Sequence, residues 1–181
     1  MKKFLILCAF CGMFLLSGCV SISNIDIQKL NQKAVEYMEA GDYEKAIARL
    51  ESILDLNDNY TETYYNLGVA YYQMNDYEKA VEALNTAIDK KDNFADAYYS
   101  RAVVYEDWAY SILEGENVEN PSIQKKVTND DKDKSLEFLK NAKSDFEKYL
   151  EHKRNAKDKE EVHEKLVQIE NDLSNVEPVF D

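Results

Sequence analysis

The chain has 181 residues, 45% of them apolar, and its 35 acidic side chains outnumber 22 basic ones to give a formal net charge of -13. The apolar fraction is sufficient for a folded core, whereas the negative charge excludes binding to nucleic acids and anionic lipid head groups, which depends on clustered Lys and Arg. Five glycines and two prolines are too few for a turn-rich sheet protein, so the composition predicts a helical one.

The first segment, residues 1–18, has the pattern of a secretory signal peptide. Two lysines precede an apolar run that is too short to cross a bilayer. Leu16, Ser17, Gly18 and Cys19 resemble the lipobox of bacterial lipoproteins, which implies cleavage before Cys19 and acylation of its thiol and its new amino group. The alternative is an ordinary signal peptide that happens to precede a cysteine.

Acylation of Cys19, for example with palmitate, would anchor the mature chain durably, because two or more acyl chains bind a bilayer far more firmly than one. Cys8 and Cys11 leave with the signal peptide, so no free thiol remains for catalysis, disulfides or metal binding. Residues 19–26 then form a lipidated tether. The resemblance implies an extracytoplasmic location in the cell envelope, with a weak preference for the outer membrane because Val20 follows the cysteine.

Residues 27–60 and 61–94 form two units of a sequence repeat. The stretch DYEKA at 42–46 returns at 76–80, which is a spacing of 34 residues. A fixed spacing of this length is typical of repeat architectures. Apolar residues within each unit fall at helical spacing on both sides of a short polar turn, so each unit is predicted to be a helical hairpin.

The second unit resembles the tetratricopeptide repeat (TPR) family through Tyr64, Leu67, Gly68, Tyr71, Tyr77, Ala80 and Ala87. The first unit resembles the same pattern more loosely, through Leu30, Lys33, Ala34, Tyr37, Tyr43, Ala46 and Ile53. The small residues let the two helices of a unit approach closely, where larger side chains would overpack. The resemblance implies an all-α fold of antiparallel helical hairpins stacked as a short TPR solenoid, with about three repeats and a C-terminal capping helix.

The third unit, residues 95–154, is predicted to contain an insertion. Its first helix begins where the 34-residue spacing predicts and continues to about Glu114. Residues 115–134 are then polar, without apolar residues at helical spacing. Whether this insertion is a disordered loop or a lid stays open. The second helix then resumes the repeat pattern with Ala142, Phe146 and Tyr149.

Residues 155–181 are predicted to form a capping helix and a tail. The helix spans about 157–175 and places its apolar side chains on one face and its charges elsewhere. A polar outer face of this kind is what the end of a stacked repeat requires. The apolar residues are Val162, Leu166, Ile169 and Leu173.

Three tyrosine doublets, at 64–65, 71–72 and 98–99, mark a second face on the first helix of the second and third units, and the same positions in the first unit continue it. Adjacent residues on a helix point about 100° apart, so both members of a doublet cannot pack against the same surface. The TPR resemblance implies that the second face lines a concave groove for peptides or partner proteins. The predicted groove residues are Asn31, Val35, Met38, Glu62, Tyr65, Val69, Tyr72, Tyr99, Val103 and Glu106.

Carboxylates flank this predicted groove at Glu39, Asp96 and Asp107. We therefore expect the groove to select basic residues of a partner segment, while the tyrosines supply rigid contact area. In the alternative interpretation, some of these tyrosines pack against the long third unit, the insertion or the terminal cap.

No motif for chemistry stands out. Asp55 begins a pattern like that of a calcium loop, yet Tyr60 occupies the position that requires glycine. His163 lies on a helix like that of zinc proteases, but Val167 replaces the second histidine. The sequence thus predicts no catalytic, cofactor or metal site.

The predicted function is that of a membrane-anchored scaffold or assembly factor in the bacterial cell envelope, which is not an enzyme and binds another envelope protein or peptide segment. The alternative is a periplasmic carrier, or a ligand-binding component associated with a transporter, in which the groove or the insertion closes over a small hydrophobic or cationic molecule.

Overall fold

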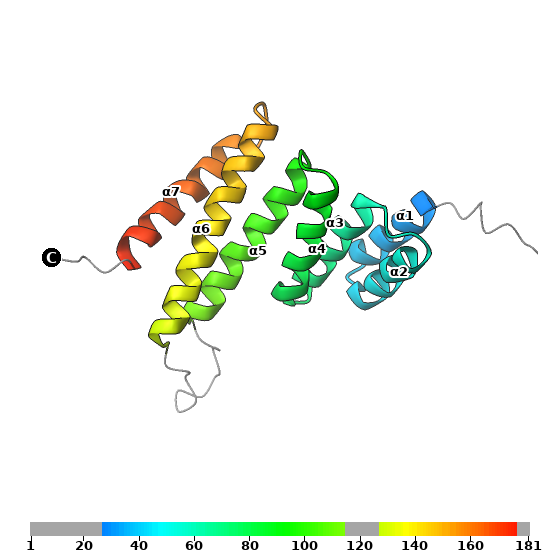
Figure 1. Cartoon of the computed structure of the whole chain (residues 1–181), viewed down its shortest axis with the longest axis horizontal. Helices are drawn as coiled ribbons and strands as arrows, with labels where there is room; N and C mark the ends of the chain where they lie inside the picture. The colour runs from blue at the N-terminus through cyan, green and yellow to red at the C-terminus, as the bar shows by residue number, and fades with distance from the viewer. Residues whose placement is uncertain (1–26, 115–126, 177–181) are drawn as a thin grey trace, which may run out of the picture.

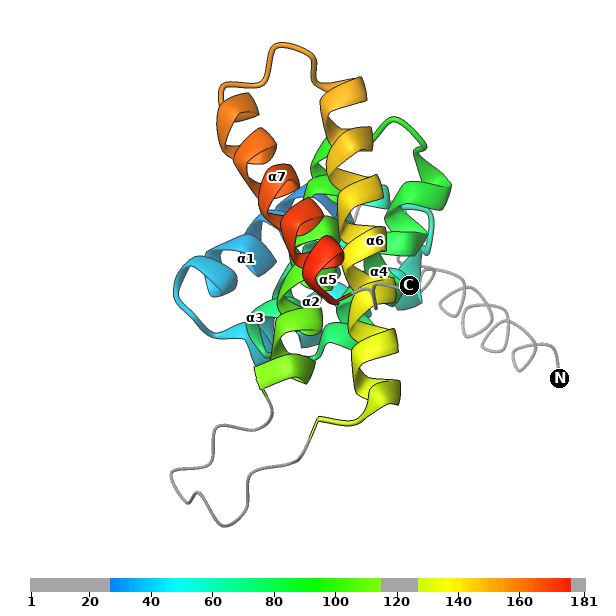
Figure 2. The same cartoon turned by 90° about the vertical axis from the view of Figure 1, so that its left-hand side faces the viewer.

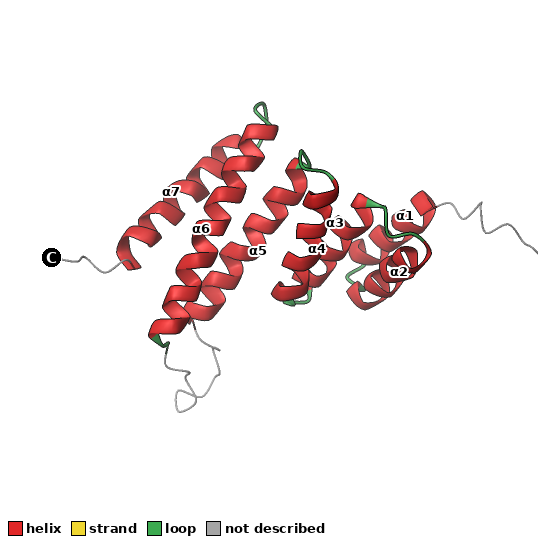
Figure 3. Ribbon diagram, viewed as in Figure 1, coloured by secondary structure: helices red, strands yellow, loops and turns green. Residues whose placement is uncertain are grey.

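The computed structural model describes residues 27–114 and 127–176, and these residues form seven α-helices and no strand (Figures 1 and 3). The helices are α1 (Ile27–Glu39), α2 (Tyr43–Leu56), α3 (Thr61–Gln73), α4 (Tyr77–Lys90), α5 (Ala95–Glu114), α6 (Asn129–His152) and α7 (Lys159–Val176). The predicted signal peptide, Cys19, the tether and most of the predicted insertion lie outside these ranges. Within them, no helix combines the length and the apolar character that crossing a bilayer requires.

The helices pair as three antiparallel hairpins, α1–α2, α3–α4 and α5–α6, and α7 packs beside α6 at the end of the row (Figures 1 and 2). Each helix mainly contacts its neighbours in the chain, as expected for a stacked repeat. The predicted fold class, an all-α solenoid of helical hairpins, is therefore confirmed.

Two turns one period apart explain why the DYEKA stretch occurs twice. Gly41 and Asn75 have positive φ angles of 75° and 59°, a region that glycine and asparagine enter most readily. Their amides, and those of the aspartates that follow, bond back to the preceding helix in the pattern of a Schellman motif. Asp42 and Asp76 then cap the next helix by accepting hydrogen bonds from the Lys45 and Lys79 amides.

Small residues hold the two helices of a hairpin close together. Ala34, Ala46 and Ala80 are fully buried, and Gly68 lies against Leu84 across the second hairpin. A methyl group built on Gly68 would come within 2.5 Å of the Leu84 Cγ atom. The glycine of the repeat pattern is therefore required here by close packing.

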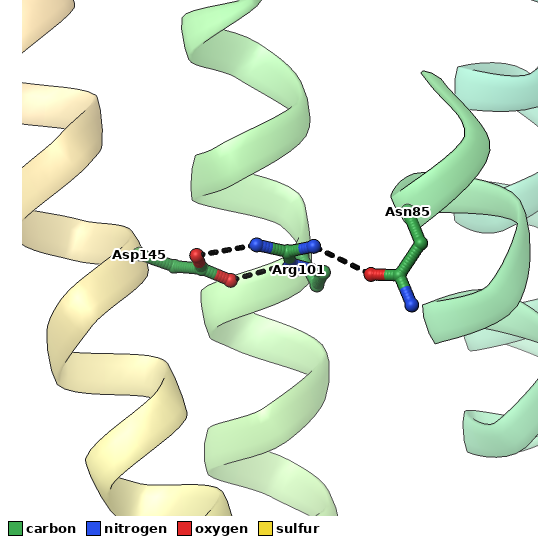
Figure 4. A network of polar contacts seen from close by, with 3 residues as sticks. All are labelled: Asn85, Arg101 and Asp145. Carbon is green, nitrogen blue, oxygen red and sulfur yellow. Dashed lines mark hydrogen bonds and ion pairs between the residues drawn. The ribbon is translucent and has the colours of Figure 1, made fainter. Parts of the chain in front are cut away.

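A polar network centred on Arg101 of α5 joins α4, α5 and α6 (Figure 4). The Arg101 guanidinium forms two bonds of 2.7 Å with Asp145 on α6 and donates a third to Asn85 on α4. Burial raises the pKa of the Asp145 carboxyl, and the Arg101 guanidinium opposes this rise. Because such a pair is stabilising only when both partners remain, this network fixes how the second and third hairpins pack.

The start of α6 corrects the predicted insertion. Residues 129–134, assigned to the insertion between 115 and 134, already form the first turns of α6. Thr128 caps this helix, because its hydroxyl accepts the Asp131 amide while the Asp131 carboxylate accepts the Thr128 amide. This capping box is stable without an apolar stripe, which is why a search for apolar periodicity missed it.

Candidate partner-binding groove

The helices α3 and α5 bring five predicted groove residues together around one hollow. Tyr65, Val69 and Tyr72 of α3 face Tyr99 and Val103 of α5 across a space of about 180 Å³. Spacings of three and four residues place each set on one helix face, and the stacking of the hairpins sets the two faces side by side. This is the shared face that the tyrosine doublets predicted.

Four further residues line the same hollow and were absent from the predicted set. Gln73 and Ser100 add polar groups to its wall, whereas Leu84 and Val104 add apolar ones. Gln73 follows Val69 by four residues, so the helical spacing itself could have identified it. Leu84 comes from α4, and no pattern within the first helix of a unit could have identified it.

In each tyrosine doublet of the second unit, the two side chains point in different directions, as helix geometry requires. Tyr64 and Tyr71 line a separate hollow of about 160 Å³ with Lys79 and other α4 residues. The Tyr71 hydroxyl donates a 2.8 Å hydrogen bond to Glu51 on α2. Burial, helped by that carboxylate, raises the pKa of Tyr71 to about 12.

Tyr72 forms one wall of the groove and is fixed by a polar contact. Its hydroxyl donates a hydrogen bond to Asp107, which links α3 to α5 beside the hollow. Burial and this carboxylate raise the pKa of Tyr72 well above its ordinary value. The phenol thus stays neutral at physiological pH, and the charge on Asp107 is not neutralised by its partner.

Tyr99 both lines the groove and packs into the core. Its ring lies 5.7 Å from that of Phe146 and 5.1 Å from that of Tyr149, centroid to centroid. Burial raises its pKa, and the negative charge of Glu161 adds to this effect. Tyr99 thus packs against the third unit, as the alternative interpretation expects, while its side chain also lines the hollow.

Other predicted groove residues lie away from the hollow. The Asn31 side chain exchanges hydrogen bonds of 2.9 and 3.1 Å with the Thr63 hydroxyl, joining α1 to α3. Val35 and Met38 are half-buried on α1, and Glu62 is exposed at the start of α3. The structure thus places these four on the first two hairpins but not around the same space.

Glu106 requires a correction. It was predicted to face a partner, but only 6% of it is exposed and its carboxylate accepts a 2.7 Å bond from Lys165 on α7. The helical face was assigned correctly, yet α7 covers this position because the terminal helix continues the stack. Its partner lies 59 residues away in sequence, beyond the reach of any local pattern.

Three aspartates in the second half of the chain accept hydrogen bonds from tyrosine hydroxyls, and only Asp107 does so from a tyrosine that lines the hollow. Besides the pair that includes Asp107, the Tyr110 hydroxyl donates to Asp172 at 2.7 Å, and the Tyr149 hydroxyl donates to both oxygens of Asp158 at 2.7 and 2.8 Å.

In the part of the chain that the structure describes, no group of three or more His, Cys, Asp and Glu residues could hold a metal ion.

Two lysines near the groove are bound to carboxylates. Lys153 bonds Asp96 at 2.5 Å, and Lys165 bonds the buried Glu106. Both lysines lie close to groove tyrosines, since Lys153 interacts electrostatically with Tyr65 and Lys165 with Tyr99. Each of these two lysines is therefore paired with a carboxylate, and each also interacts with a second one, Lys153 with Asp158 and Lys165 with Asp107.

Comparison with known proteins gives one family match and several similar folds. Residues 37–103 match the family described as tetratricopeptide repeat. No curated protein matches the chain in sequence.

Similar solved structures cover most of the chain. The first TPR domain of Spaghetti (RPAP3), bound to the HSP90 peptide SRMEEVD, has a TM-score of 0.60 at 20% identity, covering 81% of this chain and 92% of its own. The TPR2B domain of yeast Sti1, in a complex with pHsp70, has a TM-score of 0.56 at 17% identity, covering 80% and 96%.

A bacterial example is the Yersinia enterocolitica type III secretion chaperone SycD in complex with a peptide of the translocator YopD. Its TM-score is 0.60 at 15% identity, and the match covers 81% of this chain and 93% of that one. At these identities the likeness concerns the fold, whereas the match to residues 37–103 concerns the sequence. The chain therefore has the fold of a tetratricopeptide repeat solenoid, with the sequence pattern of that family in residues 37–103.

Proposed function

We propose that the protein is a membrane-anchored interaction scaffold or assembly factor of the bacterial cell envelope, which holds a segment of another protein in the groove between α3 and α5. The observation that carries this proposal is the convergence of Tyr65, Val69, Tyr72, Tyr99 and Val103 on one hollow. Aromatic side chains of this kind give large contact area at low cost in conformational entropy. The peptide complexes of Spaghetti (RPAP3) and SycD, which share the fold, support binding of this type.

The size of the hollow favours a protein segment over a small-molecule carrier. Pockets for small molecules usually enclose about 300 to 1,000 Å³ and bury most of the ligand. The hollow between α3 and α5 encloses about 180 Å³. This volume suits one side chain of a longer segment whose remainder lies along the groove.

The anchoring part of the proposal rests on the sequence of the first nineteen residues. The lipobox-like stretch ending in Cys19 supports acylation, and acyl chains would hold the repeats beside a membrane. Replacing Cys19 with Ala should remove incorporation of a labelled fatty acid into the protein. Unchanged incorporation would contradict the anchor and leave the groove unaffected.

The groove part can be tested by site-specific crosslinking in cells that make the protein. A photoreactive amino acid at Tyr65 should crosslink one envelope protein, whereas the same amino acid at Glu147, exposed on α6, should not. Replacing Val69 with Trp in the Tyr65-labelled chain fills the hollow and should abolish the product. Equal crosslinking from both positions, or a product that survives the filled hollow, would refute the proposed site.

A further inference from the structure

We infer that the groove takes a basic segment: an extended peptide with one aliphatic or aromatic side chain in the hollow between α3 and α5, and Lys or Arg residues beside Asp107 on α5 and Glu161 on α7. This inference rests on the proposed function and adds the chemistry of the partner. Three observations support it: the volume of the hollow, the hydrogen bonds between aspartates and tyrosines, and the ion pairs that the nearby lysines form.

The hollow has the size of one large apolar side chain. An apolar cavity of about 150 Å³ holds one benzene ring. The space lined by Tyr65, Val69, Leu84 and Val103 encloses about 180 Å³. A leucine, methionine or phenylalanine side chain fits this volume, and the polar groups of Gln73 and Ser100 remain at its wall for the peptide backbone.

Uncharged tyrosine hydroxyls, and not cations, donate the side-chain hydrogen bonds that link three aspartates to the tyrosines. Asp107, Asp158 and Asp172 accept hydrogen bonds from tyrosine hydroxyls. A phenol satisfies the hydrogen bonding of a carboxylate but does not neutralise it, because the pKa of each of these phenols is raised by burial and by its aspartate. Glu161, exposed on α7, adds a further negative charge beside Tyr99.

The two lysines in the same region are each in an ion pair with a carboxylate. Lys153 is paired with Asp96, and Lys165 with Glu106. An acidic peptide would therefore meet net negative charge at this site, whereas a basic peptide would gain several attractive contacts. Charge complementarity of this kind selects the partner and speeds its association.

The length of the site follows from the helix that carries it. From Tyr99 to Asp107, α5 advances about 12 Å, since an α-helix rises 1.5 Å per residue. An extended peptide covers this length in about four residues at roughly 3.3 to 3.6 Å per residue. Ten-residue peptides are therefore long enough to test the site.

The test is selection from a displayed library of random ten-residue peptides, using the full chain purified in mild detergent. Enriched sequences should contain one large apolar residue with at least two Lys or Arg within four positions. A synthetic peptide of an enriched sequence should bind the Asp107→Asn variant about three- to tenfold more weakly, because the amide oxygen still accepts the Tyr72 hydroxyl but the charge is lost. The matched control, Glu147→Gln on α6, should leave the affinity unchanged.

The outcomes separate this inference from the function on which it rests. Enriched peptides that are acidic or neutral, and that lose binding in the Val69→Trp variant, would overturn the basic preference and leave the peptide-binding groove in place. Basic peptides that bind Val69→Trp as well as the natural chain would show general attraction to an acidic protein and overturn both. Absence of any enriched sequence would also overturn both. Tyr65→Ala, checked for helicity, provides a second groove variant if Val69→Trp does not fold.

Discussion

Replacing Gly68 with Ala tests how closely the helices of the second hairpin pack. The new Cβ atom would lie 2.5 Å from the Leu84 Cγ atom, 3.0 Å from its Cδ2 atom and 3.1 Å from the Ala80 carbonyl oxygen. Leu84 is fully buried, so it cannot move away without displacing its own neighbours. Overpacking of this kind costs about 1 to 3 kcal/mol, whereas the higher helix propensity of alanine returns about 1 kcal/mol.

We therefore expect the Gly68→Ala variant to lose about 1 kcal/mol in the free energy of unfolding, which lowers Tm by roughly 2 to 4 °C for a protein of this size. The measurement is urea denaturation followed by circular dichroism at the helical band. In a Leu84→Ala background the obstructing side chain is absent, so the same change should stabilise the chain by up to about 1 kcal/mol. A gain in stability from Gly68→Ala in the natural chain would refute the packing argument.

Three further predictions concern other parts of the fold. Asp145→Ala should lower the free energy of unfolding by about 3 to 5 kcal/mol, because it leaves the Arg101 guanidinium without its carboxylate. Replacing both residues, Asp145 by Leu and Arg101 by Met, should lower it less. Equal losses for the single and the double variant in denaturation would contradict this. Asn75→Ala should cost about 1 kcal/mol while Asn75→Gly is neutral, since the backbone there is left-handed, and equal denaturation midpoints would argue against strain. The contribution of Tyr71 to the free energy of unfolding should be constant up to about pH 10 and fall as the pH rises toward 12, because the pKa of Tyr71 is higher in the folded than in the unfolded chain. Absorbance at 295 nm should show that tyrosine ionises at higher pH in the native protein than in urea.

Much of the fold follows from the sequence because each hairpin is built from the same contacts between residues that are close in the chain. The aspartates of the DYEKA stretches cap helices, and the small residues at positions 34, 68 and 102 stand where paired helices meet. Helical spacing placed Tyr65 on one face of α3 with Val69 and Tyr72, and the TPR resemblance implied that this face shares a groove with Tyr99. Apart from the shared groove, each of these inferences needs only neighbours within one or two turns of the chain.

The errors come from contacts that no local pattern encodes. The burial of Glu106 depends on Lys165, which reaches it from α7, and Asn31 is held by Thr63 on another hairpin. The start of α6 was a different case, because the Thr128 capping box is visible in the sequence once polar caps are read together with apolar periodicity.

The unequal hairpins have a mechanical consequence. In α1 only Ala34 is buried, whereas α6 buries seven side chains, including Phe146 and Tyr149. In a stack where each unit mainly contacts its neighbours, local stability follows local burial. Tension applied between the N-terminal end and a segment bound beside α5 would act on every hairpin between these two points. The first hairpin would then unfold first, because it buries fewer side chains, while the third hairpin and α7 stay folded.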